Sequence, residues 1–137
     1  MIIADANLLS ETSKAAPDQL VLDWIAAHYG QLHLTTPVLS ELRYGCEKLP
    51  PSKRRNELES WLSDLLIQFA DRILPFDQDA AEAHGAMRAR LNAIGKTCSP
   101  SDSYIAGIAL SVGCPVATRN VDDFQWTGVR LVNPWEA

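Results

Sequence analysis

The sequence is poor in the residues that build disulfide frameworks and zinc sites. It has only three cysteines, Cys46, Cys98 and Cys114, and they are odd in number and widely spaced. This pattern fits neither a set of disulfides nor a zinc cluster, and it favours three small hydrophobic side chains in a reducing compartment. We therefore expect a cytoplasmic protein.

Long hydrophobic runs are also missing. The uncharged run from Ser103 to Thr118 is too short to span a bilayer, and Gly113 and Pro115 interrupt it. The N-terminus has no basic segment, and Asp5 falls where a signal peptide would be apolar. These absences argue against a membrane-spanning or secreted protein, and we expect no membrane partner.

Three catalytic or nucleotide-binding signatures are absent: G-x-G-x-x-G, the Walker loop and G-x-S-x-G. No internal repeat, biased segment or linker divides the 137 residues, so we predict one domain over residues 1–137. Apolar residues make up 47% of the chain and charged residues 21%, which is an ordinary balance for a globular protein.

What is present is an alternation of strand and helix patterns. Strands are predicted at Ile2–Ala4 and in "LHLTT", "RILPF", "PVAT" and "RLVN", and helices over residues 17–30, 37–49, 51–70, 77–95 and 99–113. The fold class predicted is α/β, a single-domain three-layer α/β/α sandwich around a mainly parallel sheet of about five strands. Ligands of such sheets bind outside the carboxyl ends of the strands.

Two carboxylates lie where a packing pattern alone would not place them. Asp5 directly follows the first strand, where it is either a turn residue or part of a site. Glu41 lies on the predicted apolar stripe of the helix over 37–49, in the middle of the helix, where it has no capping role. That stripe consists of Val38, Leu42, Gly45 and Leu49.

Two further acids are placed in the same way. Asp102 lies at the top of the predicted apolar stripe of the helix over 99–113, where it is either a helix-start residue or part of a site. That stripe runs through Ile105, Ala109 and Val112. Asp122 and Asp123 follow the strand "PVAT" and precede an apolar Phe124, so one of them faces the same edge of the sheet.

Four carboxylates in one pocket raise each other's pKa, and they remain ionised together only beside a counter-charge. Oxygen ligands of this kind suit a hard divalent cation, Mg²⁺ or Mn²⁺.

Basic residues form two clusters although the formal net charge is −5. The segment from Arg43 to Arg55 carries a local charge of about +4, and Arg88, Arg90 and Lys96 add a second group. Each cluster is either an ordinary solvated surface or a surface that attracts a polyanion.

The chain resembles the PIN-domain ribonucleases, and among them the VapC-type toxins of toxin–antitoxin pairs. The stretches that carry the resemblance are "MIIADANLLSE", "SELRYG", "RILPFDQDAAEAHG", "SDSYIAGIAL", "TRNVDDF" and "LVNPW". The resemblance implies that Asp5, Glu41, Asp102 and Asp123 form the acidic quartet that holds Mg²⁺ or Mn²⁺. It also implies that Asn7, Thr118 and Asn120 line the same pocket, where their alternative role is turn-forming and capping.

The activity implied by the resemblance is endonucleolytic hydrolysis of single-stranded or loop RNA, such as tRNA or rRNA. The candidate RNA contacts are Arg43, Lys53, Arg54, Arg55 and Arg119. Tyr44 or Tyr104 would stack on an unpaired base, or else pack in the ordinary way. The implied partners are a second copy in a homodimer and an antitoxin, whose helix or tail lies along an apolar groove. Ala6 departs from the family, which usually has Thr or Ser there, and it keeps open a catalytically silent RNA-binding or protein-docking module.

Overall fold

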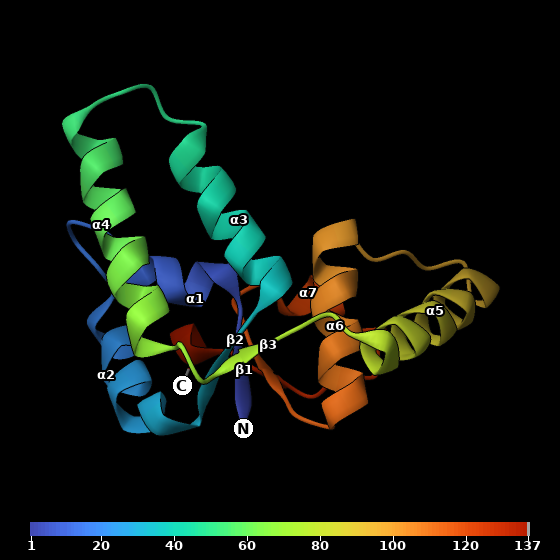
Figure 1. The fold of residues 1–137 in the computed structure, drawn as a ribbon. Coiled ribbons are helices and arrows are strands. Elements are labelled where there is room, and N and C mark those ends of the chain that lie inside the picture. Colours follow the sequence, from blue (N-terminus) through green and yellow to red (C-terminus); the bar gives the residue numbers. More distant parts are fainter. Residues whose placement is uncertain (137) are drawn as a thin grey trace.

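The structure is a computed structural model that describes residues 1–136, and a five-stranded sheet lies at its centre (Figure 1). All strand pairs are parallel, in the order β3-β2-β1-β4-β5. The strands are β1 (Ile2–Ala4), β2 (Leu32–Thr35), β3 (Ile73–Leu74), β4 (Val116–Ala117) and β5 (Leu131–Val132). The predicted parallel α/β sheet is confirmed, with each strand after the first shorter than its sequence pattern.

Seven α-helices and two short 3₁₀ helices connect the strands within residues 1–136. The helices are α1 (Ala6–Glu11), α2 (Gln19–His28), α3 (Thr36–Glu47), α4 (Lys53–Gln68), α5 (Gln78–Ala93), α6 (Pro100–Val112) and α7 (Val121–Phe124); the 3₁₀ helices are η1 (Tyr29–Gln31) and η2 (Pro134–Glu136). The five long helices match the prediction. The sequence reading missed α1 and α7, because helices of six and four residues are too short for an apolar period to emerge.

Side chains that accept hydrogen bonds from backbone amides start the long helices. The capping residues are Asp18 for α2, Thr35 for α3, Ser52 for α4, Asp77 for α5 and Ser99 for α6. The predicted end of α6 is also present, because Gly113 follows it with φ of 71°, a left-handed conformation that glycine adopts without steric cost.

The helices lie on both sides of the sheet (Figure 1). Helices α1 to α4 connect β1, β2 and β3 on one side, while α5, α6 and α7 lie on the other. This division follows from right-handed crossovers, because the chain first runs outward from β1 to β3 and then returns past β1 to β4 and β5. The order therefore reverses between β1 and β4, and the carboxyl ends of these two strands form the crevice where ligands of open α/β sheets bind.

Helix α4 contributes Leu62 and Leu65 to the core, and Phe69 directly after it is buried as well. The stripe of α3 was partly wrong. Its buried residues are Val38, Leu42 and Cys46, which follow an i, i+4, i+8 row, and Gly45 and Leu49 are only half-buried. Glu41 is half-buried, at the margin of this row.

The stripe predicted for α6 was wrong at its end. Ile105 and Ala109 are buried, but Val112 is 47% exposed. Seven of the 13 residues of α6 are buried and they are nearly consecutive, from Asp102 to Ala109. The middle of the helix is thus enclosed almost all round, and its last turn faces solvent, so that a single stripe does not describe it.

Helices α5 and α6 pack closely because Gly107 has no side chain. A Cβ atom built on Gly107 would lie 2.7 Å from His84 Cβ and 3.0 Å from the Ala80 carbonyl oxygen. This close approach sets the spacing between the middle of α6 and α5.

No helix within residues 1–136 is long and apolar enough to cross a membrane. All three cysteines are free, as expected. Cys46 and Cys114 are buried, and Cys98 is half-buried.

Candidate active site

Asp5 is the first acid of the site, and it is buried at the carboxyl end of β1 with 3% of its surface exposed. Its Oδ1 accepts a hydrogen bond of 2.8 Å from the Ala6 amide, so Asp5 also caps α1. Burial raises the pKa of Asp5 above its ordinary value, and the charges of Glu41 and Asp123 raise it further. Asp5 is therefore both a capping residue and a carboxylate whose ionised form is disfavoured by burial and by neighbouring negative charges.

Thr118 joins the ends of β1 and β4. Its hydroxyl donates a 2.6 Å hydrogen bond to Asp5 Oδ2 and accepts one of 2.9 Å from the Asn120 amide. Asn7 Nδ2 lies 3.4 Å from both Asp5 Oδ2 and Thr118 Oγ1, and Asn7 Oδ1 accepts from the Arg119 amide. These contacts bridge the crevice where the strand order reverses and hold the Asp5 carboxylate in one orientation.

Glu41 reaches the site from α3, on the other side of the crevice. Ser101, in the first turn of α6, donates its hydroxyl to Glu41 Oε1. This bond links the two helical layers across the carboxyl edge of the sheet. The sequence reading missed Ser101, and its only signal was its place between the Ser99 cap and Asp102.

Asp102 and Asp123 complete the group. Asp102 is buried in the first turn of α6, and burial raises its pKa, with smaller contributions from the charges of Asp5 and Asp123. Asp123 lies in α7 and is exposed. Asp5 is thus within electrostatic reach of the other three carboxylates, each of which comes from a different segment.

The family model described as PIN domain matches residues 2–127. The chain belongs to the PIN domain family. It is 39% identical to "VapC ribonuclease Y4jK" of Sinorhizobium fredii, over 99% of both chains.

Two solved structures extend the comparison. The structure of FitAcB from Neisseria gonorrhoeae superposes with a TM-score of 0.93 at 33% identity and covers 100% of both chains. VapBC-5 from Mycobacterium tuberculosis, a member of the VapBC family of toxin–antitoxin systems, superposes with a TM-score of 0.64 at 28% identity, over 74% of this chain and 81% of that one. The predicted PIN fold is confirmed.

Within residues 1–136 of this PIN domain, no three His, Cys, Asp or Glu side chains lie close enough together to hold a metal ion directly. The acids are neighbours across a wider space. Mg²⁺ is usually held by one or two carboxylates and several waters, so a wider acidic pocket suits Mg²⁺ better than it suits a cation that needs a closed protein cage. The donors are oxygens, which matches the same class of ion.

Two of the supporting residues differ in how they meet the pocket. Asn7 contributes its side chain, whereas Asn120 contributes its backbone amide, and its exposed side chain makes no capping hydrogen bond. Ala6 meets the pocket through its amide as well, and that bond to Asp5 does not depend on the side chain at position 6.

The predicted RNA contacts fall into two groups, residues that are exposed and residues that bond to other groups of the protein. Arg43, Lys53 and Arg119 are exposed, and the Arg119 guanidinium lies 5.3 Å from the Trp135 ring centroid. Arg54 and Arg55 are engaged within the protein. Arg55 contacts Glu47 and Glu59, each at 3.0 Å, and the Leu49 carbonyl, while Arg54 bonds to the Ser13 carbonyl.

The two candidate stacking residues are both exposed at their faces. Tyr44 is 63% exposed, with Lys48 Nζ 5.3 Å from its ring centroid. Tyr104 is 41% exposed and stacks on His84, with ring centroids 4.8 Å apart. Phe76 also contacts the Tyr104 ring in a T-shaped arrangement, with centroids 5.0 Å apart, so Tyr104 is partly packed against the protein.

Proposed function

We propose that this protein is a metal-dependent endoribonuclease of the VapC type, the toxin of a toxin–antitoxin pair, which hydrolyses phosphodiester bonds of single-stranded or loop RNA. The observation that carries the proposal is the pair of buried carboxylates, Asp5 and Asp102, at the crevice of the sheet. Both have a raised pKa, and two further acids stand beside them. Maintaining these groups without a bound cation is unfavourable, so selection for function is the simplest reason for their presence.

Asp5, Asp102 and Asp123 would hold Mg²⁺ or Mn²⁺, directly or through water, and Glu41 would hold a second ion or orient the attacking water. A bound cation of this class polarises a scissile phosphate and lowers the pKa of a water molecule. Thr118 and Asn7 keep the Asp5 carboxylate turned toward the pocket. Ser101 does the same for Glu41 from the opposite layer.

The test is cleavage of a structured RNA by the purified protein, free of any partner, with Mn²⁺ or with a chelator. Asp5→Asn and Asp102→Asn should abolish cleavage, because each replaces an anionic ligand with a neutral one of the same shape. The matched control is Asp122→Asn, which removes an exposed acid next to Asp123 and should leave cleavage unchanged. Circular dichroism establishes that every variant is folded.

Cleavage that continues in the chelator, or that survives Asp5→Asn, would overturn the metal-dependent mechanism. RNA binding without cleavage at any metal concentration would instead support the alternative function, a catalytically silent RNA-binding module, which the Ala6 departure from the family leaves open. A finer variant is Thr118→Val, which removes only the hydroxyl that bonds to Asp5. We expect it to lower cleavage or metal affinity about tenfold to a hundredfold, as is usual for residues that orient a metal ligand.

The antitoxin would occupy a groove of about 400 Å³ between α1, α3 and α4. Glu41 and Asn7 lie in its lining, as do the apolar Leu42, Leu58 and Trp61. An amphipathic segment with a basic residue fits this distribution, because its apolar side would cover the hydrophobic wall and its cation would meet Glu41. The protein itself would form a homodimer, which sedimentation equilibrium would measure.

Gly45 provides a clean test of the groove. It lines the groove, and a Cβ atom there meets nothing within 4 Å, so Gly45→Leu fills the groove without disturbing the fold. The probe is an antitoxin encoded by a short reading frame adjacent to this gene, once sequencing of the locus has identified it, and it is produced together with the toxin. Gly45→Leu should weaken co-purification and preserve RNA cleavage, whereas unchanged co-purification would place the antitoxin elsewhere.

A further inference from the structure

Two cations beside the acidic site have no acidic partner. Arg88, in α5, and Lys96, just after it, are exposed, and no carboxylate lies within 4.0 Å of either among residues 1–136. Arg90, the third cation of this segment, is different, since its Nη2 donates to the Thr127 carbonyl at 3.3 Å. Arg88 and Lys96 therefore present two charges to solvent.

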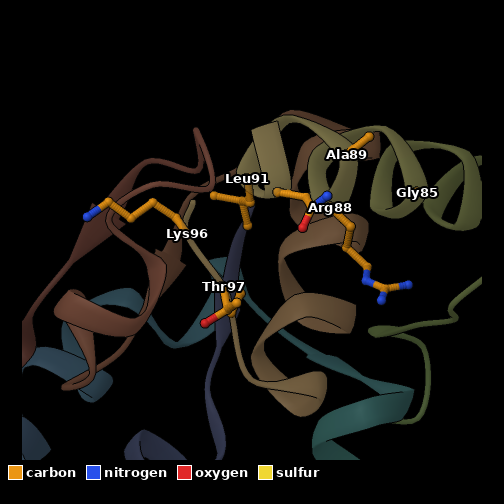
Figure 2. Close-up of a pocket in the computed structure, with 8 residues that line it drawn as sticks. Gly85, Arg88, Ala89, Leu91, Lys96 and Thr97 are labelled. Atoms are coloured by element: carbon orange, nitrogen blue, oxygen red, sulfur yellow. The ribbon is translucent and has the colours of Figure 1, made fainter. Parts of the chain in front are cut away.

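These two residues border a pocket of about 490 Å³ (Figure 2). Asn92, Thr97 and Cys98 contribute to its lining, and no acid does. Figure 2 shows Arg88 and Lys96 extending to opposite sides of the pocket, with their charged ends pointing away from each other. A single small anion would need cations that converge, so the arrangement fits a ligand with charges spaced along its length.

A second, smaller pocket of about 220 Å³ continues the first, because Arg88 and Cys98 line both. Tyr104 and His84 belong to its wall, and they form the stacked pair already described. At the other end, Lys96 Nζ lies 4.9 Å from the centroid of Trp126, which is 52% exposed. Exposed aromatic rings thus flank both cations, and this combination is typical of surfaces that bind single-stranded nucleic acid.

The surface reaches the acidic group through Cys98. Its sulfur donates to the Asp123 carbonyl oxygen at 3.5 Å. A strand lying over Arg88 and Lys96 would therefore run next to α7, the helix that carries Asp123.

We propose that the Lys96–Arg88 surface binds the RNA strand on one side of the scissile bond, with a phosphate at each cation and a nucleoside in the pocket between them. This inference rests on the proposed function, since it names how the substrate of that same site is held. It assigns the main substrate contacts to the α5 side of the site rather than to Arg54 and Arg55.

The experiment measures binding of a fluorescently labelled single-stranded oligouridylate by anisotropy, in chelator so that no cleavage occurs, over a series of salt concentrations. Arg88→Ala/Lys96→Ala is compared with Arg54→Ala/Arg55→Ala, which removes the same two charges from the α3–α4 side. At about 0.1 M salt the first variant should bind about tenfold more weakly. The negative slope of the logarithm of the binding constant against the logarithm of the salt concentration should become shallower by about 1.4, because two counterion-releasing contacts are lost. The second should change both quantities much less. Arg88→Lys/Lys96→Arg, which keeps the charges, should bind nearly as the parent does.

An Arg88→Ala/Lys96→Ala variant that binds as the parent does would overturn the inference and leave the nuclease proposal intact, because cleavage by the parent is measured separately. Equal losses in the two double variants would overturn it as well, since only overall charge would then matter. A change in sedimentation of Arg88→Ala/Lys96→Ala without a change in RNA affinity would make this face a contact between copies and would also refute it. If the parent protein neither binds nor cleaves RNA, the proposed function itself fails.

Discussion

The α3–α4 pair and the α5–α6 pair lie on the two sides of the sheet and use their basic residues differently (Figure 1). Each pair supplies one acid, Glu41 from α3 and Asp102 from α6, and each carries a cluster of basic residues. In the first pair the densest cations are paired internally, as Arg55 is with Glu47 and Glu59. In the second, Arg88 and Lys96 face solvent without an acidic partner.

The difference shows that a run of basic residues does not measure free positive charge. The α3–α4 segment has the larger local charge in the sequence, but α4 places Glu59 four residues after Arg55, on the same helical face. The intervening loop brings Glu47 to the other side of the same guanidinium. The smaller cluster is the more available one, because no carboxylate within residues 1–136 lies within 4.0 Å of Arg88 or Lys96.

The two pairs also differ in how tightly they pack, and glycine substitutions test this difference with the largest expected effect. Gly107→Ala places a Cβ atom 2.7 Å from His84 Cβ and should destabilise the protein by about 1–3 kcal/mol. Gly45→Ala is the matched control in α3, where a Cβ meets nothing within 4 Å, and it should be neutral or stabilise by up to about 1 kcal/mol. Urea unfolding measures both. Equal effects would mean that close approach does not distinguish the α5–α6 pair.

The acidic residues between the two helix pairs give the second-largest expected effect, a change in protein stability that depends on pH and on Mg²⁺. Asp102 and Asp5 have a raised pKa in the folded protein, so between the ordinary carboxyl pKa and the raised values the folded state binds more protons than the unfolded chain does. The metal-free protein should therefore lose stability as pH rises from the ordinary carboxyl pKa, about 4, through the raised pKa values of these two groups. Mg²⁺ should restore it, and Asp102→Asn should raise the thermal midpoint in chelator and remove much of the response to Mg²⁺.

Glu11 is the internal reference for that measurement. Lys14 Nζ lies 2.6 Å from its Oε2, although this oxygen accepts no hydrogen bond of regular geometry, and the Asp18 amide donates to its Oε1. These partners lower the pKa of Glu11, so its contribution to stability is present above the ordinary carboxyl pKa and is lost as pH falls below it. Glu11→Gln should lower the thermal midpoint at neutral pH by an amount that Mg²⁺ does not change. If the unaltered protein in chelator instead became more stable between weakly acidic and neutral pH, the raised pKa values of Asp5 and Asp102 would be contradicted.

The sequence predicted the sheet, its parallel pairing and the five long helices because each depends on local patterns of apolar residues and caps. It also pointed to Asp5, Glu41 and Asp102, because a carboxylate at a strand end or on an apolar stripe conflicts with packing. Those conflicts can be read without knowing which residues meet. The roles of these residues in catalysis remain predictions.

The rest required three dimensions. Ser101 has no pattern of its own, and only the fold brings it to Glu41. The pairing of Arg55 with Glu47 depends on the path of the loop between α3 and α4. That Arg88 lacks an acidic partner among residues 1–136 depends on which side chains the fold brings near it. The end of the α6 stripe at Val112 was misjudged because periodicity gives a helix's face and not the depth to which that face is covered.

The smallest expected effect gives the sharpest comparison of the two basic clusters. If its ion pairs with Glu47 and Glu59 prevent Arg55 from binding RNA, then removing those two charges should allow Arg55 to contact a phosphate. Glu47→Gln/Glu59→Gln removes both charged partners and keeps hydrogen-bonding side chains of the same size. It should strengthen oligouridylate binding a few-fold, with a salt slope about 0.7 steeper, since one more phosphate contact forms.

The control for this gain is Glu82→Gln/Asp79→Gln, which removes two exposed acids from α5 and changes net charge by the same amount. A gain in both variants would trace the effect to overall charge, and a gain confined to Glu47→Gln/Glu59→Gln would trace it to a released guanidinium. No gain in either would mean that the α3–α4 pair lies outside the path of the RNA. The two clusters would then differ in position relative to the substrate, and ion pairing would be incidental to that difference.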